Sequence, residues 1–414
     1  MESPKNIGMS TERLARIDTA VNKHIGPDKF AGAVTLVARR GQIVQQKSYG
    51  LMVRETNQPM QSDAIFRIYS MTKPIACVAL MMLYEQGHFQ LTDPVFKFIP
   101  AFSDLKVYVG GAGDDTQLEP LTEPVNIHHL LTHTAGLSYH FLEYGRVESL
   151  YRETFTSEGW ALPLAEFVDS LCQFPLAYKP GTAWRYSFAH DVVARLVEIM
   201  SGQPFDQFLY DNIFQPLGMD DTGFFVPKNK LDRFTAMYGS NSIDESDMTA
   251  TKWYGSAMMG VNRLLASPLD SLESKPHNIL RGGAGLVSTA TDYLRFCQMM
   301  LNNGQLDGVR LLGRKTIELM TANHLPPNLL PYELGGLYQL GMGYGLGVNT
   351  LMDLGQCQSV GSVGSYAWGG AANTTFWIDP QEEMIGILMA QFQPSGYHLL
   401  TPDFRVAVYQ AIVD

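Results

Sequence analysis

A serine, Ser70, precedes a lysine, Lys73, by three residues at the start of an apolar run. Residues three apart lie on the same face of a helix, so the lysine amine can reach the serine hydroxyl. Apolar residues recur at helical spacing from position 75 to 83, and Gly87 stands where a helix commonly ends. The fold must therefore contain a helix that starts at this pair and stops near Gly87.

The start of a helix suits a nucleophilic serine. Its unpaired backbone N–H groups and partial positive charge favour negative charge that develops nearby, and the same field disfavours a protonated Lys73. A serine hydroxyl is a weak nucleophile until a neighbouring base takes its proton. The pair therefore indicates a serine hydrolase or an acyl transferase that works without a catalytic histidine.

The same spacing occurs a second time, between Ser103 and Lys106. This match follows a proline and leads into the short extended run 107–109 instead of an apolar helix, so we interpret Ser103 as part of a surface loop. Because the spacing arises so easily, a catalytic assignment needs partners elsewhere in the chain.

A tyrosine can supply the proton relay that a lysine-assisted serine needs. Tyr186 lies in a loop just before a predicted helix, where Ser187 can cap the first turn and Asp191 falls within it. This position leaves the phenol free to face a cleft. A second tyrosine, Tyr210, belongs to a literal Tyr-x-Asn but lies inside the amphipathic segment 205–214, so we expect it to pack in the core.

Strand-like runs lie at both ends of the chain, and helical patterns lie between them. The first two runs predict a hairpin. The runs cover 31–39, 42–49, 343–348, 365–379 and 383–391, and the helical patterns include 160–172, 191–200 and 205–214. Strands at both ends with helices between them indicate a sheet that is built from the two termini and interrupted by an inserted helical lobe.

Together the motifs resemble the serine β-lactamase and penicillin-recognising superfamily. They are most similar to the class C β-lactamase-like esterases, called family VIII carboxylesterases, whose three motifs are S-x-T-K, Y-S-x and often W-G-G. Here these positions read SMTK at 70–73, YSF at 186–188 and WGG at 368–370. The connecting segments at 129–137, 213–219 and 283–289 also resemble that family, so the likeness covers nearly the whole chain in the right order.

The resemblance implies an α/β (α+β) fold of the β-lactamase/transpeptidase-like type. Its antiparallel sheet would be built from N- and C-terminal segments flanked by helices, with an inserted all-helical lobe. We assign residues 1–90 and 241–414 to the α/β domain and residues 91–240 to the mainly helical lobe. The active site would lie in the cleft between them.

The resemblance also implies the catalytic roles. Ser70 would attack the substrate carbonyl, and Lys73 and Tyr186 would share the abstracted proton and return it to the leaving alcohol. The backbone N–H groups of Ser70 and Ala371 would form the oxyanion hole, with Ala371 on an edge strand. The motifs do not decide whether Lys73 or Tyr186 is the base in the ground state.

Two departures from the β-lactamase motifs bear on the substrate. Trp368, Gly369 and Gly370 stand where a Lys-Thr-Gly motif would supply a cation and a hydroxyl, and Phe188 replaces an asparagine. Both changes favour uncharged, apolar esters over anionic amides. We therefore expect a serine carboxylesterase for short- to medium-chain esters that forms an acyl-Ser70 intermediate, and a weak β-lactamase side activity is compatible with the same residues. Further pocket residues are predicted at Tyr139, Phe141 and Trp184.

Several other functions are compared with that of a carboxylesterase. An acyltransferase or transesterase, a β-lactamase, or a peptidase for small D-amino-acid derivatives could work with the same serine, lysine and tyrosine. An α/β-hydrolase would need a complete G-x-S-x-G, which the chain lacks. A metal hydrolase is suggested by His128, His129 and His133, but no acidic partner stands at ligand spacing, so packing or capping is expected. A non-enzymatic binding module would have lost a catalytic side chain.

Charge and hydropathy limit the partners. The net charge of −11 disfavours nucleic acid and anionic membranes, because either needs a basic face. The N-terminus lacks the apolar core of a signal peptide, and the longest apolar run, 74–83, is about half of the ~20 residues that a spanning helix needs. We expect a cytoplasmic monomer or homodimer that acts on a small-molecule ester and needs no metal or other cofactor.

Overall fold

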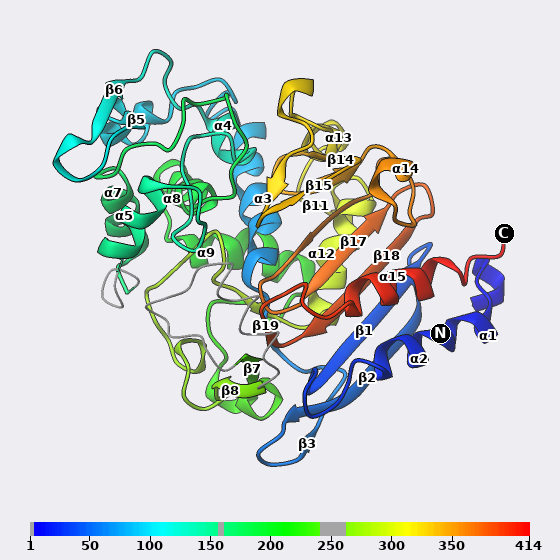
Figure 1. The fold of residues 1–414 in the computed structure, drawn as a ribbon. Coiled ribbons are helices and arrows are strands. Elements are labelled where there is room, and N and C mark those ends of the chain that lie inside the picture. The colour runs from blue at the N-terminus through cyan, green and yellow to red at the C-terminus, as the bar shows by residue number, and fades with distance from the viewer. Residues whose placement is uncertain (1–3, 156–160, 241–261) are drawn as a thin grey trace.

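The computed structural model of the 414-residue chain describes residues 4–155, 161–240 and 262–414. Its centre is an antiparallel sheet of eight strands in the order β14-β15-β16-β17-β18-β1-β2-β3, in which N-terminal and C-terminal strands lie side by side (Figure 1). The prediction of an antiparallel sheet built from both termini is therefore confirmed. The strands are β1 (Gly32–Arg39), β2 (Gln42–Val53), β3 (Gln58–Pro59), β14 (Met342–Tyr344), β15 (Asn349–Leu351), β16 (Tyr366–Gly369), β17 (Thr375–Asp379) and β18 (Met384–Ala390).

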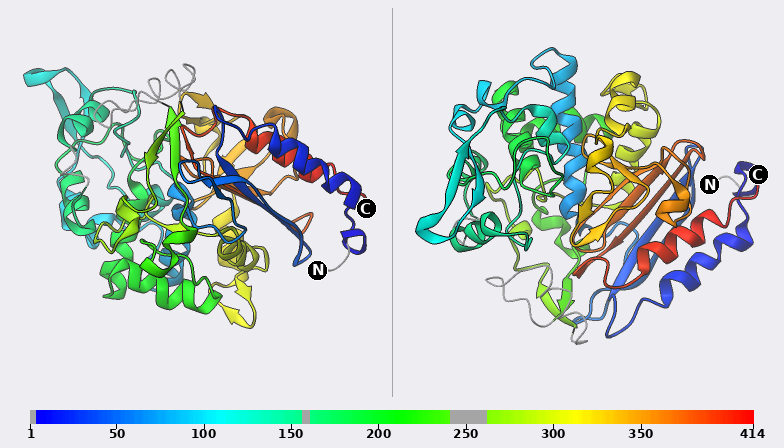
Figure 2. Two further views of the ribbon diagram at one scale, coloured as in Figure 1. Left: turned by 90° about the horizontal axis from the view of Figure 1, so that it is seen from below. Right: turned by 45° about the horizontal axis from the view of Figure 1, so that its top comes forward.

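The predicted N-terminal hairpin is present, since β1 pairs antiparallel with both β2 and β18. Every residue of β1 is buried, because helices cover both faces of the sheet. One face packs on α2 (Arg16–Asn22) and α15 (Leu400–Tyr409), which lie side by side (Figure 2). The other face packs on α12 (Ala290–Leu301) and on the helix that follows Ser70.

Two of the predicted strand runs are each divided by a turn. The run 365–379 consists of β16 and β17, because the chain reverses at residues 370–374. There the Gly370 N–H donates to the Thr374 oxygen (2.7 Å), and Asn373 has a φ of +63°, a left-handed conformation that asparagine tolerates better than most residues. In the run 343–348, β14 ends at Tyr344 and a turn with Gly347 at φ +90° leads into β15. Alternation of apolar residues does not reveal such reversals.

Helices are the main regular elements of residues 91–240. These helices are α4 (Ile127–Leu131), α5 (Arg146–Thr154), α7 (Leu164–Leu171), α8 (Ala189–Ser201), α9 (Phe205–Leu209) with η6 (Tyr210–Phe214), and α10 (Gln215–Leu217). The two-stranded ribbon of β5 (Lys106–Gly110) and β6 (Gln117–Pro120) belongs to the same region, so the lobe is not all-helical. The domain division at residue 240 remains a proposal, and residues 241–261 lie outside the described residues.

Apart from the helix that follows Ser70 and several 3-10 turns, the remaining elements are short. They are α1 (Thr11–Leu14), β4 (Phe66–Arg67), β7 (Met237–Ser240), β8 (Asn262–Ala266), β9 (Val287–Ser288), β10 (Gln305–Leu306), β11 (Val309–Arg310), α13 (Arg314–Thr321), β12 (Glu333–Leu334), β13 (Leu337–Tyr338), α14 (Leu354–Cys357) and β19 (Phe392–Gln393). Within the described ranges, no helix combines the length and the apolar character needed to cross a membrane.

Candidate active site

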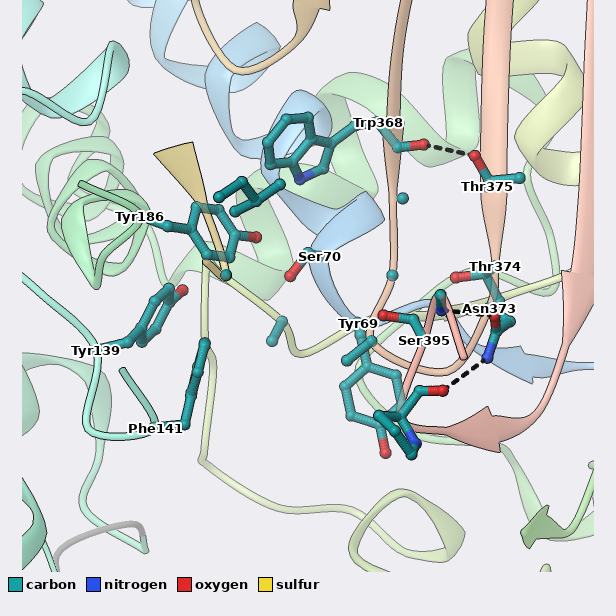
Figure 3. Close-up of a pocket in the computed structure, with 18 of the residues that line it drawn as sticks. Tyr69, Ser70, Tyr139, Phe141, Tyr186, Trp368, Asn373, Thr374, Thr375 and Ser395 are labelled. Atoms are coloured by element: carbon teal, nitrogen blue, oxygen red, sulfur yellow. Dashed lines mark hydrogen bonds between the residues drawn. The ribbon is translucent and has the colours of Figure 1, made fainter. Parts of the chain in front are cut away.

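A cavity of about 760 Å³ opens beside Ser70, and both the helical region and the sheet contribute to its walls (Figure 3). Most of the predicted site residues line it: Ser70, Tyr139, Phe141, Tyr186, Phe188, Trp368, Gly369, Gly370 and Ala371. These residues come from four segments that lie far apart in the sequence, and the fold brings them to one place.

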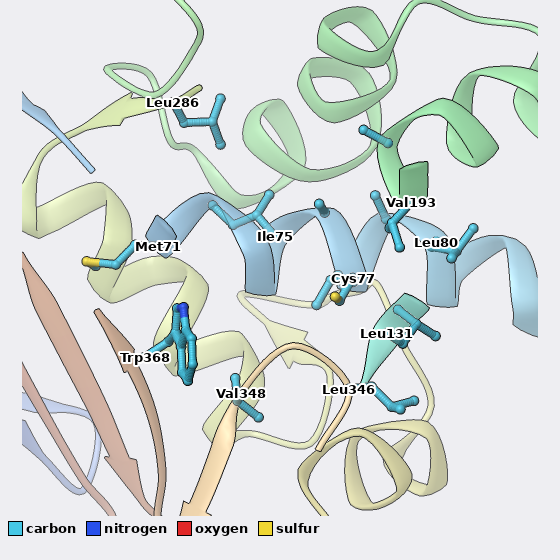
Figure 4. Close-up of a cluster of buried hydrophobic side chains, with 14 of the residues drawn as sticks. Met71, Ile75, Cys77, Leu80, Leu131, Val193, Leu286, Leu346, Val348 and Trp368 are labelled. Atoms are coloured by element: carbon cyan, nitrogen blue, oxygen red, sulfur yellow. The ribbon is translucent and has the colours of Figure 1, made fainter. Parts of the chain in front are cut away.

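The helix that begins at the Ser-Lys pair is buried along most of its length. A 3-10 turn, η2 (Tyr69–Met71), leads into α3 (Thr72–Glu85), so Ser70 lies just before the regular helix, which ends before Gly87 as predicted. The residues of α3 from 72 to 81 are all buried. Figure 4 shows Val193 of α8 on one side of this helix and Trp368 and Val348 on the other. The apolar run that predicts the helix thus fixes it between the helical region and the sheet.

Lys73 lies directly behind the nucleophile. Its Nζ is 3.2 Å from the Ser70 Oγ and donates to the Gly283 carbonyl oxygen at 2.6 Å. The side chain is fully buried, and burial lowers the pKa of Lys73 to about 7, while the Asp191 carboxylate opposes this shift. Near neutral pH the amine is therefore uncharged in a large fraction of molecules and can accept the serine proton.

The Tyr186 hydroxyl points toward Ser70 (Figure 3). Burial raises the pKa of Tyr186 above its usual range, although the Ser70 and Trp368 side chains act in the opposite direction. The phenol therefore stays protonated at neutral pH and can donate a proton. Its ring is held by aromatic neighbours, with centroid distances of 4.9 Å to His133 and 5.6 Å to Trp368.

The turn with Ala371 lies against the backbone that precedes the nucleophile. A Cβ on Gly370 would come within 2.4 Å of the Ile68 oxygen, so this close approach requires glycine. The prediction that Ala371 lies on an edge strand is wrong, because Ala371 follows the end of β16 and β16 is an interior strand. The pairing of β16 with β15 stops at Ala367, and the two residues after it line the cavity.

Aromatic side chains form one wall of the cavity. The rings of Tyr139 and Phe141 are stacked with a centroid distance of 4.8 Å, and Phe188 packs edge-on to Tyr139 at 4.4 Å. Trp184 is not among the lining residues, contrary to the prediction. It stacks behind Tyr186 and packs on Tyr332 at 4.4 Å, so Tyr186 lies between it and the cavity.

Two further residues of the site were missed by sequence reasoning. The Gly283 N–H donates to the Asp191 Oδ1 at 3.2 Å, while its carbonyl accepts from Lys73. A Cβ on Gly283 would come within 2.8 Å of Asp191 and 2.9 Å of the Tyr139 hydroxyl. Asp191 is buried, and burial raises its pKa, which the nearby Arg281 counteracts. The only signals were an acid in the first turn of α8 and a glycine-rich connecting segment.

The residues considered as alternatives lie elsewhere. Ser103 is exposed and donates to the carboxylate of Asp104. Tyr210 is 53% exposed, so the prediction that it packs in the core is wrong; the π-helical turn η6 carries it outward.

The histidines have structural contacts. His129 forms a reciprocal capping box with Asn126 at the start of α4, as expected, and His133 is buried with its Nδ1 at 3.0 Å from the Ser187 Oγ. Across the described part of the chain, no three His, Cys, Asp or Glu side chains are grouped in a way that could hold a metal ion.

The chain is similar to several known proteins. The family model described as Beta-lactamase matches residues 17–410. Protein Rv1367c of Mycobacterium tuberculosis (strain ATCC 25618 / H37Rv) is 32% identical over 369 residues, which are 88% of this chain and 86% of that protein. Esterase EstB of Burkholderia gladioli is 29% identical over 420 residues, covering 96% and 94% of the two chains. The structure of EstCE1, a hydrolase with promiscuous acyltransferase activity, matches with a TM-score of 0.77 and 25% identity over 96% of this chain and 99% of that one.

Proposed function

The chain belongs to the β-lactamase family, and we propose that it is a serine carboxylesterase that cleaves short- to medium-chain esters through an acyl-Ser70 intermediate. The observation that carries the proposal is the 3.2 Å contact between the Ser70 hydroxyl and a buried lysine whose pKa is lowered to about 7. This contact supplies a nucleophile and a base in a cavity with an aromatic wall.

In the proposed acylation step, Lys73 takes the proton of the Ser70 hydroxyl as the Oγ bonds to the ester carbonyl carbon. The negative charge moves to the carbonyl oxygen, where the backbone N–H groups of Ser70 and Ala371 would stabilise it. When the bond to the leaving alcohol breaks, Tyr186 protonates the alcohol oxygen and is reprotonated by Lys73. In deacylation, water attacks the acyl group, and its proton passes through the same groups back to the Ser70 Oγ.

The choice of an ester over a charged amide rests on the cavity wall. Trp368 presents an indole in place of a cation, and Phe188 presents a phenyl ring to Tyr139 in place of an amide. An uncharged acyl chain gains from burial against these rings, whereas an anionic group in the same place would lose hydration, because neither ring can pair with its charge.

Substrate preference tests this proposal. Short p-nitrophenyl esters are expected to turn over with a kcat/KM at least about 10²-fold above that of a penicillin or a cephalosporin, because the apolar wall offers little to a carboxylate; such a ratio is about 3 kcal/mol of transition-state binding. Initial rates over a series of acyl lengths measure it. Faster hydrolysis of either β-lactam would overturn the assignment as an esterase.

The pH dependence follows from Lys73. The protonated amine cannot accept the serine proton, so kcat/KM for a neutral ester should rise with pH around a midpoint of about 7 and then level off. The buried His133 and His190 do not compete as explanations, because burial keeps their pKa values well below 6.5 and both stay uncharged. Asp191→Asn should move the midpoint to lower pH, since the carboxylate raises the pKa of Lys73. An unchanged or upward-shifted midpoint would contradict this account.

Acyl transfer is a second candidate, favoured by the size of the cavity. Drug-sized ligands occupy pockets of about 300–1,000 Å³, so a cavity of about 760 Å³ leaves room for an alcohol acceptor beside a short acyl group. The acyltransferase activity in the description of EstCE1 supports the same possibility. Product analysis with a competing primary alcohol should detect a new ester beside the free acid. Formation of the acid alone would exclude transfer to that alcohol.

A further inference from the structure

A short segment at the end of the sheet, residues 391–396, contacts the turn that carries Ala371. The Asn373 Nδ2 donates to the backbone oxygens of Phe392 (2.6 Å) and Pro394 (3.4 Å). Its Oδ1 accepts a hydrogen bond from the Gly396 N–H at 3.2 Å. Both the nitrogen and the oxygen of the side-chain amide thus form hydrogen bonds with this segment, and Asn373 is only 5% exposed.

The same segment also holds the backbone just before Ser70. The Gln391 amide accepts from the Arg67 N–H (3.2 Å) and donates to the Arg67 oxygen (3.0 Å). The Gln393 side chain hydrogen-bonds the phenol of Tyr69, which directly precedes Ser70 and has a φ of +42°. A left-handed backbone at a residue other than glycine is strained and persists only where surrounding contacts impose it.

The turn that carries Ala371 also contacts the backbone before Ser70 directly. The Thr374 Oγ1 donates to the Ile68 oxygen at 3.3 Å, and Gly370 packs on the same oxygen. Residues 67–69 and 370–374 therefore form one hydrogen-bonded unit that is closed by residues 391–396. Figure 3 shows Asn373, Thr374 and Ser395 together on the side of the cavity near Tyr69.

We propose that Asn373 is a positioning residue for the oxyanion hole. Through residues 391–396 it fixes the spacing between the backbone N–H groups of Ser70 and Ala371. This inference rests on the proposed serine mechanism, in which both N–H groups bind the tetrahedral intermediate. Donors in an oxyanion hole act only at about 2.7–3.1 Å from the developing charge, so small shifts of the turn weaken stabilisation of the transition state more than binding of the substrate.

Two substitutions test the proposal. Asn373→Gly keeps a residue that tolerates positive φ but removes all three hydrogen bonds of the side chain. Asn373→Asp keeps the size and the acceptor for Gly396 and loses both donors. The matched controls are Asn303→Gly and Asn303→Asp, because Asn303 is an exposed asparagine with a φ of +56°. Active-site titration with a p-nitrophenyl phosphonate counts functional sites, so that rates are expressed per active molecule.

Loss of an oxyanion donor costs about 10²–10³-fold in kcat, and a displaced donor should cost part of that. We expect Asn373→Gly to lower the per-site kcat by about 10- to 100-fold, with KM within about 3-fold of the wild type. Its affinity for an alkylboronic acid, which forms a tetrahedral adduct with serine, should fall by the same factor. A merely structural role would lower the number of titrated sites but not the boronate affinity of those that remain.

Three results would overturn the proposal. They are a per-site kcat and boronate affinity within 2-fold of the wild type, a rise in KM with unchanged kcat, and equal losses in the Asn303 variants. If Asn373→Gly does not fold, Asn373→Asp supplies the same comparison. Failure of the serine mechanism itself is separable, because Ser70→Ala would then retain turnover whatever the Asn373 variants do.

Discussion

Ser70→Ala is expected to lower kcat for a p-nitrophenyl ester by at least about 10⁴-fold. Removal of a catalytic serine abolishes the covalent route and leaves only binding and oxyanion stabilisation, and such losses reach about 10⁶-fold in serine hydrolases. The residue lies on a turn beside the cavity and not inside the hydrophobic core, so thermal unfolding should change little. Rates with excess enzyme measure the loss, and a melting curve checks the fold.

Ser103→Ala is the matched control for this substitution. Ser103 stands at the same spacing from a lysine but is exposed, and its hydroxyl contacts only the neighbouring carboxylate among the hydrogen bonds of the described residues. Its kcat and KM should equal those of the wild type. If Ser70→Ala kept more than a tenth of the activity, or if Ser103→Ala lost it, the nucleophile would have to be sought elsewhere.

Tyr186→Phe should lower kcat by about 10²–10⁴-fold, the usual range for removal of a general acid or base. The phenyl ring keeps the contacts with His133, Trp184 and Trp368, so the fold should be retained. Only the hydroxyl that points toward Ser70 is lost (Figure 3). Because the alcohol then leaves without a proton donor, the loss should be larger for an alkyl ester than for a p-nitrophenyl ester, whose leaving group needs less protonation.

Tyr210→Phe removes the hydroxyl from the tyrosine of the other Tyr-x-Asn, which is 53% exposed and lies away from the cavity. It should change neither kcat nor KM. Steady-state rates of both variants with one alkyl and one aryl ester complete the comparison. Equal losses in the two tyrosine variants, or a loss in the Tyr186 variant that does not depend on the leaving group, would remove Tyr186 from the proposed proton path.

The parts of the site that could be predicted from the sequence are those defined by local geometry. The spacing of Ser70 and Lys73 along a helix places the amine at the hydroxyl whatever surrounds it, and the structure has them 3.2 Å apart. The prediction of Tyr186 also rests on local sequence, because it depends only on a tyrosine that stands in the loop just before a helix. A sheet built from both termini could be predicted because β1 and β18, from opposite ends of the chain, are buried and mostly apolar runs.

The parts that could not be predicted depend on contacts between distant segments. Gly283 lies 210 residues after Lys73, and no local pattern shows that its carbonyl accepts from the lysine. Asp191 falls in the first turn of α8, where an acid is expected on electrostatic grounds alone, and only the folded chain shows it buried beside that amine. The prediction that Trp184 lines the pocket was wrong because the sequence shows aromatic residues at 184 and 186 but not which of the two rings faces the cavity.

The central claim is that Ser70 is the nucleophile, and labelling with a phosphonate ester tests it most directly. The protein is treated with a p-nitrophenyl phosphonate, and peptides of the labelled and unlabelled chain are compared by mass spectrometry. The account predicts one adduct per chain on Ser70, formed more slowly as the pH falls below about 7 because Lys73 becomes protonated. An adduct on Ser103, or a chain that remains unlabelled while esters are still hydrolysed, would contradict it.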